Sequence, residues 1–549
     1  MPSTICLRCL KRTLPPIDTT CSLSITHRAA FSTTPSLSAQ PVKKKASVKT
    51  GPQAKAGKTL RLAKNKPVQA GRPPAAGERK ALRKRIVLSN TNALEVQGLE
   101  NLTTDNAADA GKLQSLEGHV LGFGNDTVEA LRALEAFKPG QGWGLFRRPA
   151  ALVRRETVEL GEALEGVMGS TNVTRQMIYG ERGSGKSVLL LQGMAMAYLQ
   201  GWIVIHLPEA REITNAQTSY QPYRTPEGET IYIQPHYTAQ LLLSISKANR
   251  GLLSNLRISE KHDLPMPLQS NISLARLVDL GANDPSLAYP IWRALWAELT
   301  SPSQPEVEGQ FRPPVFVSMD GVDHIMRPSA YLNSETKPIH AHELAVARDY
   351  SNLLSGKTSL PNGGMIMAAT SASTRPSVPT LDHVLARKVA ERQLQNILSI
   401  CEDLKHQAES AKATQDLDIT ALEAIRSHNF ESPLVAKQVS NFRDRIQRLC
   451  YDDRPLQDVQ RALTSQEFKI PEWDPYAIID QRVSDVMESV EVRKVEGLSK
   501  VEARGVMEYY ARSGMVRAAI TEGLVSEKWT LAGNGMVGEL EKATVMARF

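Results

Sequence analysis

The octet Gly-Glu-Arg-Gly-Ser-Gly-Lys-Ser at residues 180–187 most constrains what this 549-residue chain can fold into. It matches the pattern GxxxxGK[ST] in full. Its glycines allow backbone N–H groups to point into a phosphate-sized nest, Lys186 can reach the β- and γ-phosphates, and Ser187 can ligate Mg²⁺ at the start of a helix. The motif predicts a phosphate-binding loop with these residues: Gly180, Glu181, Arg182, Gly183, Ser184, Gly185, Lys186 and Ser187.

Apolar runs on both sides of the octet predict how the loop is supported. Residues 176–179 are typical of a short strand entering the loop, and residues 188–199 have the apolar density of a buried helix leaving it. Strands alternating with helices imply a parallel sheet covered by helices on both faces, so the predicted fold class is α/β. The further strands are expected at 202–207, 315–320 and 365–371.

Two of these strands end in polar residues that can complete a nucleotide site. The run Val-Phe-Val-Ser-Met ends in Asp320, the candidate Walker B acid that holds the Mg²⁺ shell together with Ser187. The strand at 365–371 ends in Ser371, which can sense the γ-phosphate. The predicted metal residues are therefore Ser187 and Asp320.

The residues decide neither whether the nucleotide is hydrolysed nor which nucleobase it carries. Many P-loop ATPases place a glutamate directly after the Walker B aspartate, but here that position is Gly321. Asp323 is a candidate to replace that glutamate as the general base. The alternative, which we weigh equally, is that Asp323 caps the turn that follows it. Slow or absent turnover is therefore favoured. The guanine box NKxD is absent from the body of the chain, so the residues leave GTP, GDP and ATP as alternatives.

The positive charge is concentrated at the N-terminus. Residues 1–90 carry 19 Lys and Arg against two acidic residues, a net charge of +17 within a total of +8, so the remainder is near −9. This split argues against a uniformly basic nucleic-acid-binding domain. Residues 1–38 are rich in Ser, Thr and Arg, as in a mitochondrial presequence, which implies a matrix location. A disordered cytosolic tail is the alternative.

Residues 39–90 form a basic arm with a net charge of about +14 and many Pro, Gly and Ala residues. Such a segment buries too little apolar surface to offset its ordering entropy, so we expect disorder in the free chain. No aromatic residue lies between Phe31 and Phe123, so any RNA binding should occur through phosphates with steep salt dependence. A solvated linker is the alternative.

The C-terminal third predicts helices and one more strand. Apolar residues at helical spacing predict an amphipathic helix over 381–404, within a helical insertion at 376–470. Residues 490–495 are typical of an edge strand, the fifth of the sheet. Ser499 followed by Glu502 predicts a helix start, and the helices over 499–549 would form a lid beside the nucleotide, as in AAA+-like folds. No apolar stretch is long enough to span a membrane.

The chain resembles the death-associated-protein family of the mitochondrial small ribosomal subunit, in a fungal-type form. The resemblance lies in Tyr-Gly-Glu-Arg-Gly-Ser-Gly-Lys-Ser at 179–187, Gly-Trp-Ile-Val-Ile-His-Leu-Pro-Glu-Ala at 201–210, Val-Ser-Met-Asp-Gly at 317–321 and Asp-Pro-Tyr at 474–476. It implies GTP or GDP with Mg²⁺, a place in the head of the small subunit with contacts to rRNA and neighbouring small-subunit proteins, and proximity to the intersubunit bridges. Together with Gly321 after Asp320, it leads us to expect weak or no GTPase activity. The family name also refers to cell death, but no residue of this sequence indicates an apoptotic role.

Two hypotheses follow. The first is a structural ribosomal protein whose bound nucleotide rigidifies its fold and whose arm lies on rRNA. The second is a catalytically active AAA+-like or STAND-like matrix NTPase, or a signalling switch, with Asp323 as its base. The expected organisation is 1–38 presequence, 39–90 basic arm, 91–149 N-terminal extension, 150–375 nucleotide-binding core, 376–470 helical insertion, and 471–549 last strand and lid.

Overall fold

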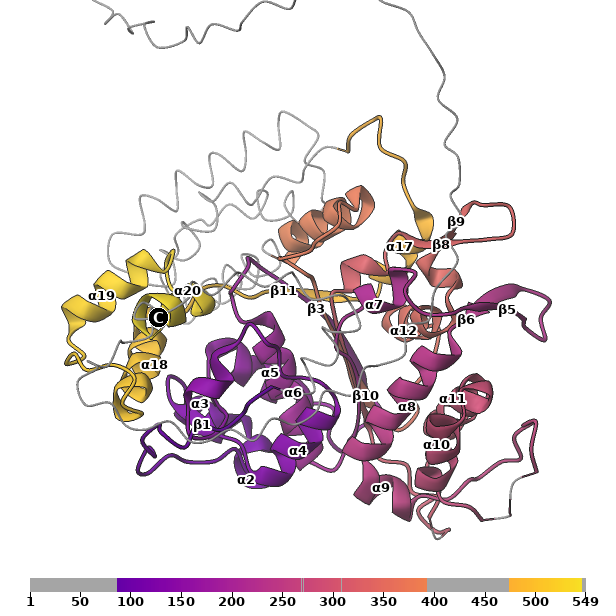
Figure 1. The fold of residues 1–549 in the computed structure, drawn as a ribbon, viewed down its shortest axis with the longest axis horizontal. Helices are drawn as coiled ribbons and strands as arrows, with labels where there is room; N and C mark the ends of the chain where they lie inside the picture. The colour runs from indigo at the N-terminus through magenta and orange to yellow at the C-terminus, as the bar shows by residue number, and fades with distance from the viewer. Residues whose placement is uncertain (1–85, 268, 270, 308, 393–472, 546–549) are drawn as a thin grey trace, which may run out of the picture. The chain divides into compact units, whose positions relative to one another are not determined.

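The computed structural model describes residues 86–267, 269, 271–307, 309–392 and 473–545 (Figure 1). The predicted presequence and residues 39–85 of the basic arm lie outside this range, as does the insertion from residue 393 to residue 470. The last five residues of the arm are described, and Leu88 among them is buried with the core. Residues 379–392 are helical, which agrees with the start of the predicted amphipathic helix.

A five-stranded parallel sheet forms the centre of the described structure, with the strand order β11-β3-β10-β7-β4. Every residue of β7 and β10 is buried, because helices cover both faces of the sheet. Ala369 of β10 is paired with Ile178 of β3 and with Asp320 of β7, so these strands end at one edge. The strands are β3 (Val173–Tyr179), β4 (Ile203–Leu207), β7 (Val315–Asp320), β10 (Gly364–Ala369) and β11 (Glu491–Lys494).

The five predicted strands and the α/β class are therefore confirmed. The last strand, β11, is an edge strand beside β3, as its mixed polar and apolar sequence predicts. Parallel strands of this kind are joined by helical crossovers, which explains the alternation of strands and helices along the chain.

One face of the sheet is covered by helices α5 and α6 and by the N-terminal residues. A Cβ atom added to Gly193 of α6 would lie 2.8 Å from the ring of Phe316 in β7, so the helix backbone packs directly on the strand. The elements on this side are α2 (Thr104–Ala107), α3 (Ala110–Ser115), β1 (Val120–Gly122), α4 (Asn125–Ala133), η1 (Gly142–Leu145), β2 (Ala150–Leu152), α5 (Arg155–Glu165) and α6 (Lys186–Leu199).

The other face is covered by α8, α10, α11 and α12 (Figure 1). Trp292 is fully buried there and donates a hydrogen bond of 2.7 Å to Asp349. The elements are α7 (Arg211–Thr214), β5 (Gln221–Arg224), β6 (Thr230–Ile233), α8 (Pro235–Ala248), α9 (Arg250–Asn255), α10 (Leu274–Asn283), α11 (Pro285–Leu299), η2 (Val322–His324), β8 (Pro328–Leu332), β9 (Pro338–His340), η3 (Ala341–Glu343), α12 (Ala345–Ser355) and α17 (Gln481–Met487).

The C-terminal residues form three helices that pack around a third hydrophobic cluster: α18 (Lys500–Arg512), α19 (Glu522–Leu531) and α20 (Val537–Thr544). The predicted helix start is confirmed, because Ser499 and Glu502 form a reciprocal capping box. Phe146 from the N-terminal part stacks on Tyr510 at 5.4 Å between ring centroids, so the first and last described segments share this core.

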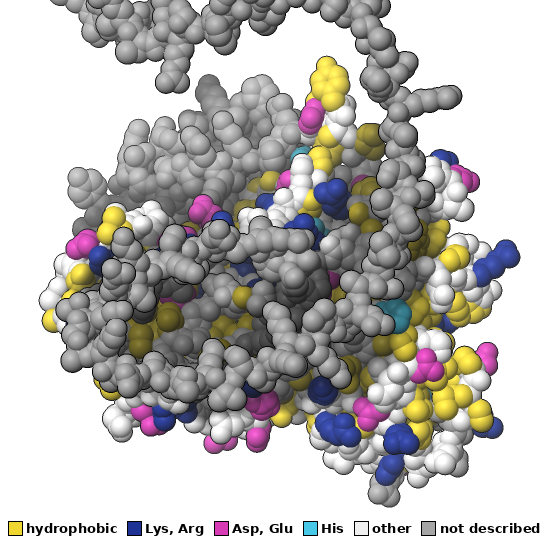
Figure 2. All heavy atoms as spheres, in the orientation of Figure 1, with side chains coloured by type: hydrophobic (Ala, Val, Ile, Leu, Met, Phe, Trp, Pro, Cys, Tyr) yellow, Lys and Arg dark blue, Asp and Glu magenta, His cyan; other side chains and the backbone are white. Residues whose placement is uncertain are grey.

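The surface of the described residues carries charged side chains of both signs (Figure 2). Figure 2 shows Lys and Arg side chains interspersed with Asp and Glu side chains over one face. Within the described ranges, no helix is both long and apolar enough to cross a membrane.

Candidate functional site

The glycine-rich octet forms the loop between β3 and α6, as predicted. Gly185, the residue before α6, has φ 101°, a left-handed conformation that glycine adopts without the strain of a Cβ atom. Gly180 approaches the residue after β11 so closely that a Cβ atom there would lie 2.4 Å from the carbonyl oxygen of Val495. The loop conformation thus requires glycine at these two positions for different reasons.

Lys186 occupies the inside of this loop. Its Nζ donates hydrogen bonds of 2.8 Å to the carbonyl oxygens of Gly180 and Glu181. Burial lowers the pKa of Lys186, and the carboxylate of Asp320 partly opposes that shift. The ammonium is therefore held in position by two backbone oxygens of the loop itself.

Ser187 and Asp320 meet at the edge where the strands end. The hydroxyl of Ser187 donates a 2.7 Å hydrogen bond to Oδ2 of Asp320. Burial alone would raise the pKa of Asp320, but the ion pair with Lys138 and the hydrogen bond from Ser187 outweigh it, and the pKa is lowered. This pair of hard oxygen donors is the chemistry that Mg²⁺ prefers.

Lys138 is a site residue that sequence reasoning missed. It lies in the loop between α4 and η1, inside the segment interpreted only as an N-terminal extension, and its Nζ forms an ion pair with Asp320. The backbone N–H of Lys138 is held by the side chain of Gln141 at 3.0 Å. No local pattern marks this lysine, because its partner lies 182 residues further along the chain.

Arg154 is a second residue that the motif did not reveal. Its guanidinium donates to the carbonyl oxygens of Ser184, at 2.7 Å, and Glu496, at 2.8 Å, and pairs with Glu156. The side chain is almost fully buried. Arg154 therefore ties the glycine-rich loop to the segment that follows β11.

Ser371 and Asp323 form one hydrogen-bonded unit beside the site. The backbone N–H of Ser371 donates to Oδ1 of Asp323 at 2.6 Å, and Oδ2 of Asp323 has no partner among the described residues. Burial raises the pKa of Asp323 to about 6. The side chain is fully buried and does not line the cavity described next, which argues against a role as base. The expected cap of the following turn is also not what the structure shows, because the carboxylate binds the backbone after β10 instead.

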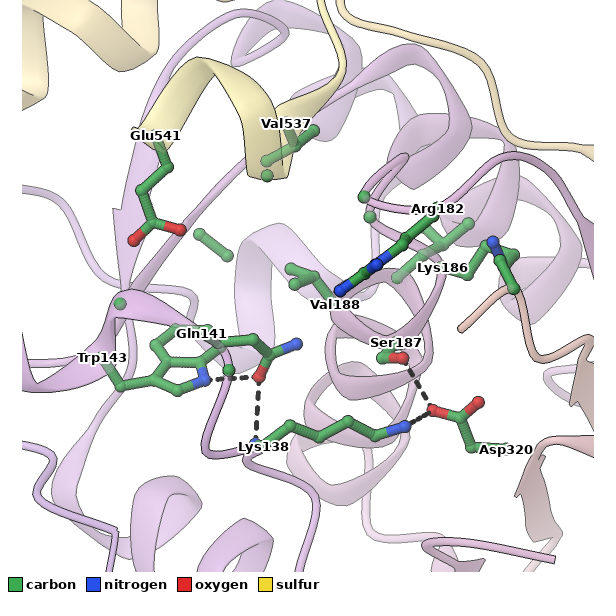
Figure 3. A pocket seen from close by; sticks show the side chains of 18 of the residues that line it. Lys138, Gln141, Trp143, Arg182, Lys186, Ser187, Val188, Asp320, Val537 and Glu541 are labelled. Carbon is green, nitrogen blue, oxygen red and sulfur yellow. Dashed lines mark hydrogen bonds and ion pairs between the residues drawn. The ribbon is translucent and has the colours of Figure 1, made fainter. Parts of the chain in front are cut away.

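A cavity of about 770 Å³ joins these residues (Figure 3). One end is formed by the loop, Asp320 and Lys138, and the other by α20 and the segment from Gln141 to Trp143. Ligand pockets for small molecules have about this volume. Of the predicted residues, the structure brings the following to the cavity wall: Arg182, Gly183, Gly185, Lys186, Ser187, Asp320 and Ser371.

The other predicted loop residues, Gly180, Glu181 and Ser184, lie behind the wall. Gly180 and Glu181 hold Lys186 through their carbonyl oxygens. The hydroxyl of Ser184 is buried without a hydrogen-bond partner among the described residues. These residues support the loop from behind. Their assignment as ligand-binding residues stays a prediction, as does that of the residues on the cavity wall.

Comparison with known proteins places these residues in a family. Residues 151–543 match the mitochondrial ribosomal death-associated protein 3 family. The chain belongs to this family. The matched range contains the glycine-rich loop, Asp320 and all of α20 but its last residue, whereas Lys138 lies before the range.

Individual relatives agree with this assignment. The chain is 36% identical over 470 residues to small ribosomal subunit protein mS29 of Neurospora crassa, a match that spans 85% of this chain and 82% of the relative. It is 24% identical over 284 residues to the mS29 protein of Schizosaccharomyces pombe, covering 50% of this chain and 57% of that protein. The bovine mS29 protein is 23% identical over 210 residues, 37% of this chain and 49% of that protein.

Proposed function

We propose that this chain is a structural protein of the mitochondrial small ribosomal subunit that binds a purine nucleotide with Mg²⁺. The observation that carries the proposal is the convergence of Lys186, Ser187 and Asp320 on one cavity, in a chain whose relatives are named small ribosomal subunit proteins. Membership of a mitochondrial ribosomal family supports the mitochondrial matrix location.

The residues at the cavity fit a nucleotide and its cation. In this proposal the loop is a P-loop, whose backbone N–H groups and Lys186 bind the phosphates. Ser187 and Asp320 would hold Mg²⁺, which neutralises phosphate charge when it is bound. Lys138 already balances the charge of Asp320 and adds a second cation at this end of the cavity. GTP or GDP is the expected ligand, with ATP as the alternative.

The C-terminal helices are the proposed lid of a P-loop NTPase fold. Helix α20 borders the cavity through Val537 and Glu541 (Figure 3). Its backbone contacts the loop directly, since the N–H of Gly538 donates a 2.9 Å hydrogen bond to the carbonyl oxygen of Gly183. A ligand in the loop would therefore contact α20 as well.

Slow or absent hydrolysis is the favoured form of this function. The residue after Asp320 is Gly321, which brings no carboxylate, and Asp323 is engaged with the backbone of Ser371 outside the cavity wall. The alternative, an active AAA+-like or STAND-like NTPase, needs a general base for the attacking water. A cavity residue other than Asp323 would have to take this role.

The basic arm is the proposed rRNA contact. Its net charge of about +14 contrasts with a body near −9, so affinity for RNA phosphates would come mainly from the arm. Deletion of residues 39–85 should then weaken association with the small subunit more at low salt than at high salt, because salt already screens the phosphate contacts that the deletion removes.

Titration of the purified full chain with GDP and Mg²⁺ tests the nucleotide part of the proposal. We expect saturable binding, with multiple turnover of GTP far below the common enzyme range of about 1 to 1,000 per second. Sedimentation of mitochondrial lysate tests the ribosomal part, with co-migration with the small subunit as the expected result. Rapid turnover together with a free or hexameric pool would favour the NTPase instead.

A further inference from the structure

The end of the cavity opposite Lys186 carries a half-buried carboxylate. Glu541 lies on α20 and lines the cavity, and Figure 3 shows its carboxylate pointing from the helix toward the segment that contains Gln141 and Trp143. Apolar side chains of Val188 and Val537 lie between this carboxylate and the loop. The cavity therefore has a cationic end and a carboxylate end, with apolar walls between them.

The carboxylate of Glu541 is held in place by the backbone at Gly142. The N–H of Gly142 forms a hydrogen bond with it, and a Cβ atom added to Gly142 would lie 1.6 Å from Oε1 of Glu541. Burial raises the pKa of Glu541, and the Gly142 hydrogen bond partly opposes that shift. Only glycine at position 142 leaves room for the carboxylate in this position.

The remaining acceptor capacity of Glu541 is available to a ligand. Among the described residues, no Lys, Arg or His forms an ion pair with it, and the adjacent Lys542 pairs with Glu539 at 2.6 Å instead. Its neighbour Tyr510 is nearly buried and stacks on Phe146. A carboxylate accepts up to about four hydrogen bonds, so a single backbone donor leaves most of its lone pairs unused.

We propose that Glu541 is the specificity-determining residue of the nucleotide site and selects guanine through the Watson–Crick edge of the base. Guanine presents two adjacent donors there, N1–H and the N2 amino group, which match the two oxygens of one carboxylate. Adenine presents an acceptor at N1, which the carboxylate repels. This assignment rests on the proposed nucleotide function, because it requires the phosphates to lie at the Lys186 end.

Four diphosphates probe this pairing separately. GDP offers both donors, IDP lacks the N2 amino group, XDP has a carbonyl oxygen in its place, and ADP has an acceptor at N1. Calorimetric titration of the full chain with each diphosphate and Mg²⁺ should give GDP the highest affinity, IDP about tenfold weaker, and XDP and ADP about 100-fold weaker. Equal affinities for GDP and ADP would overturn the assignment without affecting the proposed function.

The substitution Glu541→Gln reverses the pattern that the base must match. An amide accepts from N1–H and donates to the C2 carbonyl oxygen of xanthine, so XDP should gain about tenfold in affinity while GDP loses about tenfold or more. The matched control is Glu527→Gln on α19, an exposed glutamate that pairs with Lys528 and does not line the cavity. We expect this control to leave all four affinities unchanged.

The outcomes separate the two proposals. Nucleotide binding with no change of base preference in Glu541→Gln overturns the role of Glu541 and leaves the proposed function standing. Failure of every diphosphate to bind the wild-type chain overturns both. If Glu541→Gln does not fold, the order of the four affinities in the wild-type chain still decides the question.

Discussion

The two ends of the cavity differ in how they are built and in what they can bind. The Lys186 end contains the loop backbone and two lysines around one buried aspartate. The Glu541 end contains a carboxylate that is held by a backbone N–H and is surrounded by apolar and aromatic side chains. The difference favours an elongated ligand with an anionic end and a flat end that donates hydrogen bonds. In this account the Lys186 end provides most of the affinity, and the Glu541 end selects the nucleobase.

Removal of the loop cation should have the largest effect. Lys186→Ala removes the charged donor at the phosphate end, so we expect GDP affinity to fall by about 100-fold or more in calorimetric titration. The matched control is Lys247→Ala, because Lys247 lies in the last turn of α8, outside the cavity wall. Unchanged GDP affinity in Lys186→Ala would contradict the placement of the phosphates at this end.

Substitution of Gly142 by alanine should alter base selection at the Glu541 end of the cavity without altering phosphate binding at the Lys186 end. Gly142→Ala forces Glu541 from its position, since the new Cβ would lie 1.6 Å from Oε1. We expect the preference for GDP over ADP to fall by about tenfold while affinity for inorganic pyrophosphate is unchanged. Gly140→Ala in the same loop is the control, because a Cβ there meets no atom within 4 Å. Equal effects of both substitutions would refute the specific role of Gly142.

Loss of the ion pair between Lys138 and Asp320 should lower the free energy of unfolding. Lys138→Met leaves a buried carboxylate without its cation, and because Lys138 is about 31% exposed we expect a loss of about 1 to 2 kcal/mol in the free energy of unfolding. GDP with Mg²⁺ should restore much of this loss. Lys112→Met, which removes an exposed i,i+3 pair with Asp109, is the control and should cost little. Denaturant titrations with and without ligand measure both.

The smallest expected effect on ligand binding is that of Asp323, whose substitution should change the pH dependence of stability instead. The pKa of Asp323 is raised to about 6 in the folded chain from 3.8, so the folded state binds this proton more tightly than the unfolded state does. Its contribution to stability is therefore present below about pH 4 and is lost as pH rises to about 6. Asp323→Asn should remove this dependence.

We expect the wild-type chain to lose about 3 kcal/mol relative to Asp323→Asn across that window, since each unit of pKa shift corresponds to about 1.4 kcal/mol. Unfolding at closely spaced pH values checks this difference. Parallel stability curves for the two proteins would show that burial does not perturb Asp323. Nucleotide occupancy should be the same in both, as expected for a residue outside the cavity wall.

The same contrast explains what the sequence could predict. The phosphate end follows from contiguous residues: the octet at 180–187 and an apolar strand that ends in Asp320. The sheet strands and the Ser499 capping box follow from apolar runs and short-range spacing for the same reason. These features depend on local backbone geometry and on periodicity.

The other end depends on contacts between distant segments. Gly142 and Glu541 meet only because α20 folds back onto the loop through the contact between Gly538 and Gly183, and Lys138 reaches Asp320 across 182 residues. Arg154 likewise joins segments more than 300 residues apart, since it binds the carbonyl oxygen of Glu496. No spacing rule relates such residues, so only the folded chain reveals them.

Identification of the nucleotide that co-purifies with the full chain tests the central claim most directly. The protein is isolated with Mg²⁺, denatured, and the released small molecules are separated by chromatography, with Lys186→Ala processed in parallel. The account predicts close to one guanine nucleotide per wild-type chain and almost none in Lys186→Ala. An adenine nucleotide, or no nucleotide in the wild-type chain after incubation with GDP and Mg²⁺, would contradict it.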